Sequence, residues 1–191
     1  DDAPGFWLDG DYGTFDFSLG YFKMSENNWG TSFTSDWLTD EDNADRDLYA
    51  GYLNYHVSET NRISGLYMYD RVRNVATGSL LDALSGTTGD KPKTDSHYLG
   101  LIYEGGTGLV NYFVEGIYQF GQADDTGLDA WYAYGHDDYD INAFAFAGDL
   151  ELDLSDAVGY GFKPHVGFIY TSGDDDPEDD NLEGYTGSLT F

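Results

Sequence analysis

The sequence predicts an all-β protein: an antiparallel up-and-down transmembrane β-barrel, with about eight strands in a single domain over residues 1–191. Three observations predict this class. The chain holds 17 Tyr, 12 Phe and 25 Gly but only 4 Pro, a composition that favours strands joined by tight turns. Apolar and polar side chains alternate at every second residue through most of the chain. The connections between these segments are alternately long and short, as in outer-membrane barrels.

The first four alternating segments predict strands because their rings and aliphatic side chains recur at every second position, and therefore share one face. These positions are Phe15, Phe17, Leu19 and Tyr21 in residues 15–21; Tyr49, Leu53, Tyr55 and Val57 in residues 48–57; Ile63, Tyr67 and Tyr69 in residues 63–70; and Leu99, Leu101 and Tyr103 in residues 97–103. Before them, Gly5–Leu8 has the pattern of the tail of a strand that arrives from upstream.

The last four segments show the same alternation. They are Val110, Tyr112, Val114, Tyr118 and Phe120 in residues 110–120; the Ala-rich series Ile141, Ala143 and Ala145 in residues 139–149; Phe162, Pro164, Val166, Phe168 and Tyr170 in residues 162–171; and Tyr185, Gly187, Leu189 and Phe191 in residues 185–191. Strands of about 10 residues match a tilted membrane-spanning strand, and rings near strand ends predict girdles at the two membrane surfaces.

The connections sort by length. The short ones are residues 58–61, 104–108 and 154–157, and the long ones are residues 24–46, 72–96, 121–138 and 172–184. One long connection contains residues 78–85, which could form a short helix. Because long and short alternate, a meander places all short turns at one end, which corresponds to the periplasmic end of an outer-membrane barrel. A soluble sandwich has no physical reason to separate loop lengths in this way.

Composition also excludes several classes of protein. A net charge of −28 makes the chain a poor partner for nucleic acid. The absence of Cys excludes disulfides, zinc–thiolate sites and Cys nucleophiles, while 17% aromatic residues argue against disorder. Mean hydropathy is −0.49, and no apolar run is long enough for a spanning helix. Because no sequence motif of a nucleophile elbow, zinc protease or P-loop occurs, we expect no enzymatic activity.

The polar side of the strands is expected to line the lumen. The candidate lining residues are Asp16, Asn54, His56, Asn111, Glu115, Gln119, Lys163 and His165, with Asp70 on the same face. This lining is mixed to acidic. His56 and His165 could pair with Glu115 in a metal or proton site, but scattered polar residues of a lumen explain them more simply. His97 and His136 fall at predicted loop ends and have no expected catalytic role.

Three acidic runs lie in the predicted long connections: residues 40–45, 136–138 and 174–181. Carboxylates at this density repel one another unless water, salt or a hard cation screens them. Asp174, Asp176 and Asp180, together with Asp42, are candidate Ca²⁺ ligands, although no run has EF-hand spacing, and a solvated acidic loop is the simpler reading. Outside the cell, such loops would gather the divalent ions that lipopolysaccharide also uses.

The segment Gly159–Pro177, GYGFKPHVGFIYTSGDDDP, resembles the alginate-export family of outer-membrane β-barrels, and Leu8–Glu26 and Asp47–Val57 look like strands from that family. The resemblance implies a porin-like channel in the outer membrane of a Gram-negative bacterium, surrounded by lipid and lipopolysaccharide. The resemblance does not imply that alginate is the substrate, because a channel for an anionic polysaccharide needs a cationic lumen. A mixed to acidic lining fits the passive diffusion or export of neutral or cationic small polar solutes better.

Other interpretations remain open. The chain could instead be a soluble secreted acidic β protein that binds calcium or carbohydrate, or a barrel that assembles around a partner protein. It could also be a complete small barrel or a segment of a larger one, and the Gly, Ser and Thr on its inner side favour the segment, because they fill little space. One placement decides the membrane interpretation: Tyr112, Val114 and Tyr118 must face outward, and Asn111 and Glu115 inward.

Overall fold

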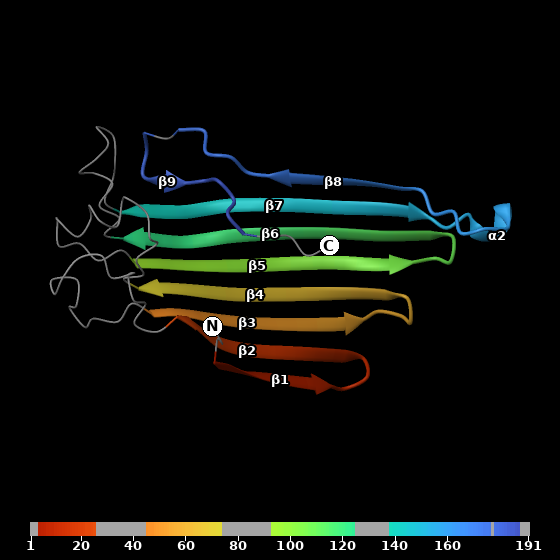
Figure 1. Ribbon diagram of the computed structural model, residues 1–191, viewed down its shortest axis with the longest axis horizontal. Coiled ribbons are helices and arrows are strands. Elements are labelled where there is room, and N and C mark those ends of the chain that lie inside the picture. The colour runs from red at the N-terminus through yellow and green to blue at the C-terminus, as the bar shows by residue number, and fades with distance from the viewer. Residues whose placement is uncertain (1–3, 26–44, 74–92, 125–137, 177, 188–191) are drawn as a thin grey trace, which may run out of the picture.

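The computed structural model describes residues 4–25, 45–73, 93–124, 138–176 and 178–187. Eight strands follow one another in an antiparallel meander, in the spatial order β1 to β8 (Figure 1). The elements are β1 (Gly5–Asp11), β2 (Phe15–Ser25), β3 (Asp45–His56), β4 (Asn61–Arg73), β5 (Lys93–Gly106), β6 (Val110–Asp124), β7 (Tyr139–Leu152), α2 (Ser155–Val158), β8 (His165–Thr171) and β9 (Asn181–Leu182). The predicted all-β antiparallel meander is confirmed.

The sheet is open at both edges. Within the described residues β1 pairs only with β2, and β8 pairs only with β7, so the predicted closure into a barrel stays a prediction. The short strand β9 runs parallel to β7 and pairs Asp140 with Asn181, beyond the point where β8 ends. After β9 the chain leaves the edge of the sheet and crosses β7 and β6 (Figure 1).

Several predicted boundaries are wrong. The strand predicted over residues 97–103 extends over Lys93–Gly106, which places His97 inside a strand rather than at a loop end. The strand predicted to begin at residue 162 begins at His165, because Pro164 just before it has no N–H to donate to a ladder. Of the strand predicted over residues 185–191, the described part (residues 185–187) lies outside the sheet.

The two faces of the sheet differ in chemistry. We call the face that carries Leu101, Val114 and Tyr118 the outer face and the opposite one the inner face. Leu101 is 63% exposed, Val114 52% and Tyr118 44%. On the inner face, Glu115 is fully buried and Gln119 is 2% exposed, although both lie between Val114 and Phe120 in the same strand. The exposed face of β6 is therefore apolar and the covered face polar, as the membrane interpretation requires; that these faces meet lipid and lumen stays a prediction.

A row of rings crosses the outer face near the long connections. Phe6, Tyr21, Tyr49, Tyr69, His97 and Phe120 lie directly opposite one another on β1 to β6. Their neighbouring ring centroids are 4.5–5.8 Å apart. Other rings, including Tyr55 and Tyr103, lie on the outer face nearer the short connections, so the apolar band runs between two aromatic levels. This arrangement matches the interfacial girdles of membrane barrels.

The short connections all lie at one end, where α2 also lies (Figure 1). Helix α2 fills the connection between β7 and β8, which is longer than the predicted residues 154–157. Among the described residues, no helix has the length and apolar character needed to cross a membrane. The long connections over residues 26–44, 74–92 and 125–137 lie outside the described residues, as do the predicted helix at 78–85 and most of the acidic runs at 40–45 and 136–138.

The tight turn between β5 and β6 depends on a glycine. Gly108 has φ of +83°, and the N–H of Thr107 donates to the carbonyl of Val110 at 2.8 Å. An added Cβ at Gly108 meets nothing within 4 Å, so a side chain there costs only backbone strain.

Replacing Gly108 with alanine is therefore expected to lower the free energy of unfolding by about 1 kcal/mol. Denaturant unfolding of the protein in lipid vesicles measures this change. Gly161→Ala is the matched control, because an added Cβ at Gly161 also meets nothing and its φ is not in the left-handed region. An equal loss in both variants would contradict the assignment of the strain to Gly108.

Candidate functional site

The inner face of β2, β3 and β4 carries a polar cluster near the short connections. Asn54 donates from Nδ2 to Oδ1 of Asp16 at 2.5 Å, and Nε2 of His56 lies 2.7 Å from the other carboxylate oxygen of Asp16. The hydroxyl of Ser64 donates to Oδ1 of Asn54 at 2.6 Å. The structure thus brings together three of the predicted lining residues, Asp16, Asn54 and His56, on adjacent strands.

A second polar cluster lies across the inner face of β6, β7 and the start of β8. Nδ2 of Asn111 donates to Oε1 of Glu151 at 2.8 Å, and Nζ of Lys163 lies 2.8 Å from Asp153 and 3.7 Å from Glu151. Nδ1 of His165 is 3.1 Å from Oδ2 of Asp149 on the neighbouring strand. The cluster therefore joins three further predicted residues, Asn111, Lys163 and His165.

The two histidines do not converge. His56 pairs with Asp16 and His165 with Asp149, so the structure does not bring them together with Glu115. The described residues therefore do not form the alternative site of these three side chains, and the two histidines lie in separate polar pairs, as the preferred interpretation has them.

Asp153 leads out of β7 into the short connection. Its carboxylate accepts from Lys163 and from the N–H of Ser155, and these contacts lower its pKa from 3.8 to about 2. The same pairing raises the pKa of Lys163 above its ordinary value. Because the pKa of Asp153 is depressed by folding, the pair stabilises the connection above about pH 4 and loses this effect as the pH falls toward 2.

We expect Lys163→Gln to return the pKa of Asp153 most of the way toward 3.8, since Lys163 is the largest cause of the shift. Carboxyl NMR titration of Asp153 measures the change. Lys163→Arg keeps the positive charge and should keep the low pKa. An unchanged pKa in Lys163→Gln would mean that Ser155 alone holds the carboxylate.

The inner face at the short-connection end is predominantly acidic. We call its carboxylates the acidic mouth: Asp9, Asp11, Asp16, Glu104, Asp149 and Glu151, which lie on one side of the sheet by register, and Asp153, which shares Lys163 with Glu151. Among the described residues at this end, Arg62 and Lys163 are the permanently charged cations on that face, and Arg62 pairs with Glu104 at 2.6 Å. A hollow of about 330 Å³ opens between Glu104, Asn111 and Glu151. Carboxylates therefore outnumber cations at this end of the inner face, and three of them, Glu104, Asp149 and Glu151, line the hollow.

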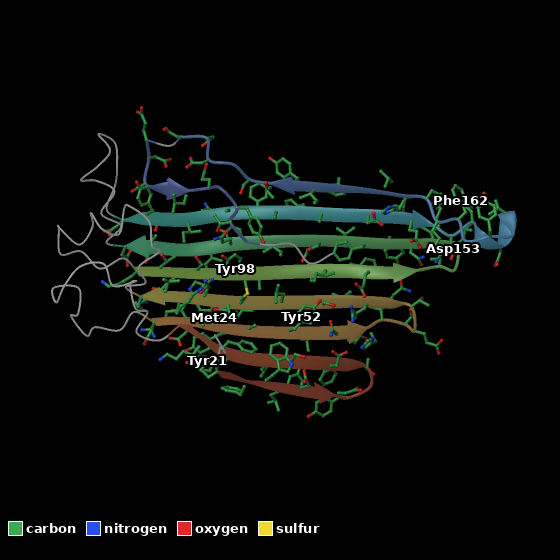
Figure 2. All side chains as sticks on the ribbon, viewed as in Figure 1. Tyr21, Met24, Tyr52, Tyr98, Asp153 and Phe162 are labelled. Carbon is green, nitrogen blue, oxygen red and sulfur yellow. The ribbon has the colours of Figure 1, made fainter. Side chains whose placement is uncertain are left out.

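The remaining predicted lining residues, Glu115 and Gln119, lie deeper on β6 and are covered. The N–H of Thr186 donates to Oε1 of Gln119 at 3.1 Å, and Nε2 of Gln119 lies 2.9 Å from Oγ1 of Thr186. Nε2 of Gln119 is also 3.2 Å from the hydroxyl of Tyr98, which Figure 2 labels near the middle of β5. The segment after β9 thus lies against the inner face at the level of Gln119.

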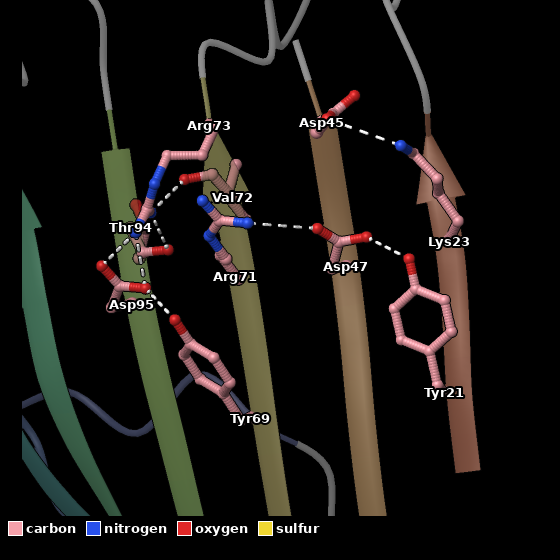
Figure 3. A network of polar contacts seen from close by, with 10 residues as sticks. All are labelled: Tyr21, Lys23, Asp45, Asp47, Tyr69, Arg71, Val72, Arg73, Thr94 and Asp95. Atoms are coloured by element: carbon pink, nitrogen blue, oxygen red, sulfur yellow. Dashed lines mark hydrogen bonds and ion pairs between the residues drawn. The ribbon is translucent and has the colours of Figure 1, made fainter. Parts of the chain in front are cut away.

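The outer face carries a charged belt beyond the aromatic row, at the ends of β2 to β5 that meet the long connections (Figure 3). Tyr21 donates to Asp47 at 2.8 Å, and Asp47 lies 3.5 Å from Arg71. On the next strands, Arg73 pairs with Asp95 at 2.6 Å, and the hydroxyl of Tyr69 donates to the same carboxylate. Tyrosine hydroxyls bonded to charged groups just beyond an apolar band are typical of the headgroup level of a membrane.

The candidate calcium ligands are exposed and separate. Asp174 and Asp176 each accept a backbone N–H from two residues further along, and the described residues hold no group of three or more potential metal ligands. Glu183 hydrogen-bonds Asp175 in the same segment, and this contact raises its pKa. A calcium site at Asp174, Asp176 and Asp180 stays a prediction.

Sequence reasoning missed part of the inner face. Glu104, Asp149 and Glu151 lie in phase with the predicted lining, but two of the predicted strands ended too early to include Glu104 and Glu151. Arg46 was also missed; its guanidinium bonds Asp70 at 3.0 and 2.6 Å. If the predicted strands had been extended by one residue to Glu104 and by two residues to Glu151, the same period-2 alternation would have placed both carboxylates on the polar face.

Comparison with known proteins agrees with this architecture. The family model described as alginate export matches residues 31–191. No characterised protein and no solved structure matches the chain. Because the match covers most of the sequence, the protein belongs to the alginate export family, a family of outer-membrane transport channels of Gram-negative bacteria rather than of enzymes.

Proposed function

We propose that this protein is a porin-like channel that lets small neutral or cationic solutes cross the outer membrane by passive diffusion or export. The observation that carries the proposal is the acidic mouth. An excess of carboxylates on the face that lines the passage attracts cations and repels polyanions, since a lumen of one charge sign concentrates its counter-ions.

The same observation argues against alginate as the solute. Every carboxylate of an alginate chain entering the acidic mouth would meet further carboxylates, and Arg62 and Lys163 are already paired with Glu104 and Asp153. Neither cation could form a bidentate or extended contact with a polyuronate without losing its partner.

The outer charged belt supports the membrane setting. Arg71 is partly exposed beyond the aromatic row, at the level where lipid phosphates lie. We propose lipopolysaccharide and other lipid headgroups as the partners of this surface, with divalent cations bridging the acidic long connections to them.

Reversal potentials measured in planar bilayers across a KCl gradient test the proposal. We expect cation selectivity that weakens at high ionic strength, because salt screens the mouth. Anion selectivity, or block of the current by an alginate oligomer at the short-connection side, would overturn it. A protein that is monodisperse in plain buffer and forms no channels would favour the soluble alternative.

A further inference from the structure

The chain segment that follows β9 lies on the inner face of the sheet. The hydroxyl of Ser172 donates to the carbonyl of Glu183 at 2.6 Å, and the N–H of Tyr185 donates to the carbonyl of Ser172 at 3.2 Å. These contacts tie the segment to Ser172, the residue that follows β8 at the edge of the sheet. Thr186 then reaches Gln119 on β6, one strand further into the sheet, through both its backbone N–H and its hydroxyl. We call Glu183–Gly187 the strap.

The sheet beneath the strap has small side chains. Ala143 and Ala145 on β7 are fully buried, although the described ranges form one sheet with no second layer of strands or helices packed on it. Ala143 lies directly opposite Gln119, the anchor of the strap, so these alanines lie where the strap crosses β7. Small side chains permit such a close approach, and a Cβ added at Gly187 would lie 2.8 Å from the ring of Tyr98.

We propose that the strap is a constriction element of the channel, anchored to Gln119, that narrows the passage on its long-connection side and sets the upper size of the solutes that pass. The inference rests on the proposed function. Gln119 lies directly opposite Tyr98 and Ala143 on the neighbouring strands, so a strap held there takes up space across three strands of the lining. A channel wall with a segment folded over it transmits smaller molecules than the bare wall.

The anchor can be removed without changing the lipid-facing surface. Gln119→Ala deletes the side chain that both Thr186 contacts join, so the strap loses these hydrogen bonds to β6 and water replaces them at the exposed Thr186. Gln122→Ala is the matched control, because Gln122 is the same residue type on the same strand but is exposed and bonds Asp140 instead.

Two measurements on the full chain in lipid vesicles test the inference. In the first, Tyr98→Cys with Gly187→Cys, which leaves both Gln119–Thr186 contacts in place, is treated with a short reducible bifunctional thiol reagent; the chain has no Cys of its own, so any link is specific. We expect a link in this pair and none between Gly187→Cys and Tyr118→Cys, whose side chain lies on the outer face. In the second, vesicle swelling is followed with neutral sugars of increasing size. We expect Gln119→Ala to admit a disaccharide roughly twofold faster or more, and Gln122→Ala to match the unmodified chain.

The outcomes separate the two proposals. If the chain conducts but the 98/187 pair does not link, or if Gln119→Ala leaves the size limit unchanged, the strap is not a constriction and the channel function stands. If the pair links but no variant conducts ions or sugars, the segment is docked but the channel function fails, and with it the constriction.

Discussion

Replacing Leu101 with arginine is expected to lower the free energy of unfolding in a bilayer by about 2–4 kcal/mol, the largest effect of a single substitution proposed for this chain. Leu101 lies on the outer face of β5, between the aromatic level at His97 and the level at Tyr103. A guanidinium at this depth would have to leave water or thin the membrane locally. Unfolding of the vesicle-embedded protein in guanidinium chloride measures the loss of unfolding free energy.

The control uses the same change on the other side of the sheet. Leu66 is on the inner face of β4, at almost the same depth, since Gly65 lies directly opposite Leu101. Leu66→Arg would meet the watery passage and is expected to cost no more than about 1 kcal/mol. If Leu101→Arg is tolerated as well as Leu66→Arg, the outer face does not meet lipid, and the membrane assignment of every strand fails with it.

Period-2 alternation predicted the meander and the orientation of β2 to β6 because each of these strands contrasts rings with polar or small side chains. For β7 the signal is ambiguous, because both of its faces are apolar along the middle of the strand, before Asp149 and Glu151 on the inner side. The alanine series of the predicted strand, Ala143 and Ala145, lies on the inner face, while Phe144 and Phe146 are 37% and 48% exposed on the outer face. Larger side chains occupy the lipid side because they contribute more apolar area there.

The strap could not be predicted for a related reason. From Tyr185 onward the sequence alternates between apolar and polar residues as a strand does. Such period-2 alternation does not distinguish a strand in the sheet from an extended segment that lies across it. The deciding contacts, from Thr186 to Gln119, join residues 67 positions apart. Some charged residues of the acidic mouth could be predicted, because the face on which a residue lies follows from the alternation within its own strand. Their ion-pair partners could not, because these lie on neighbouring strands.

The second large effect concerns selectivity. In the double variant Asp149→Asn with Glu151→Gln, we expect the ratio of cation to anion permeability to fall by about threefold or more, because a charge-lined entrance concentrates counter-ions by tenfold or more at low salt. These substitutions remove two carboxylates from the inner face of β7 and leave His165 and Lys163 with weaker partners. The reversal potential across a KCl gradient measures the change.

Position rather than net charge should govern this effect. Glu59→Gln with Asp156→Asn removes the same total charge at the same end of the protein, but Glu59 lies in an exposed turn and Asp156 in α2, away from the inner face. This control should shift the reversal potential little, and both shifts should shrink in 1 M salt, where the Debye length is about 3 Å. Equal shifts of the reversal potential in the two double variants would mean that the overall charge of the protein sets the selectivity. Asp149 and Glu151 would then have no specific role in cation selectivity.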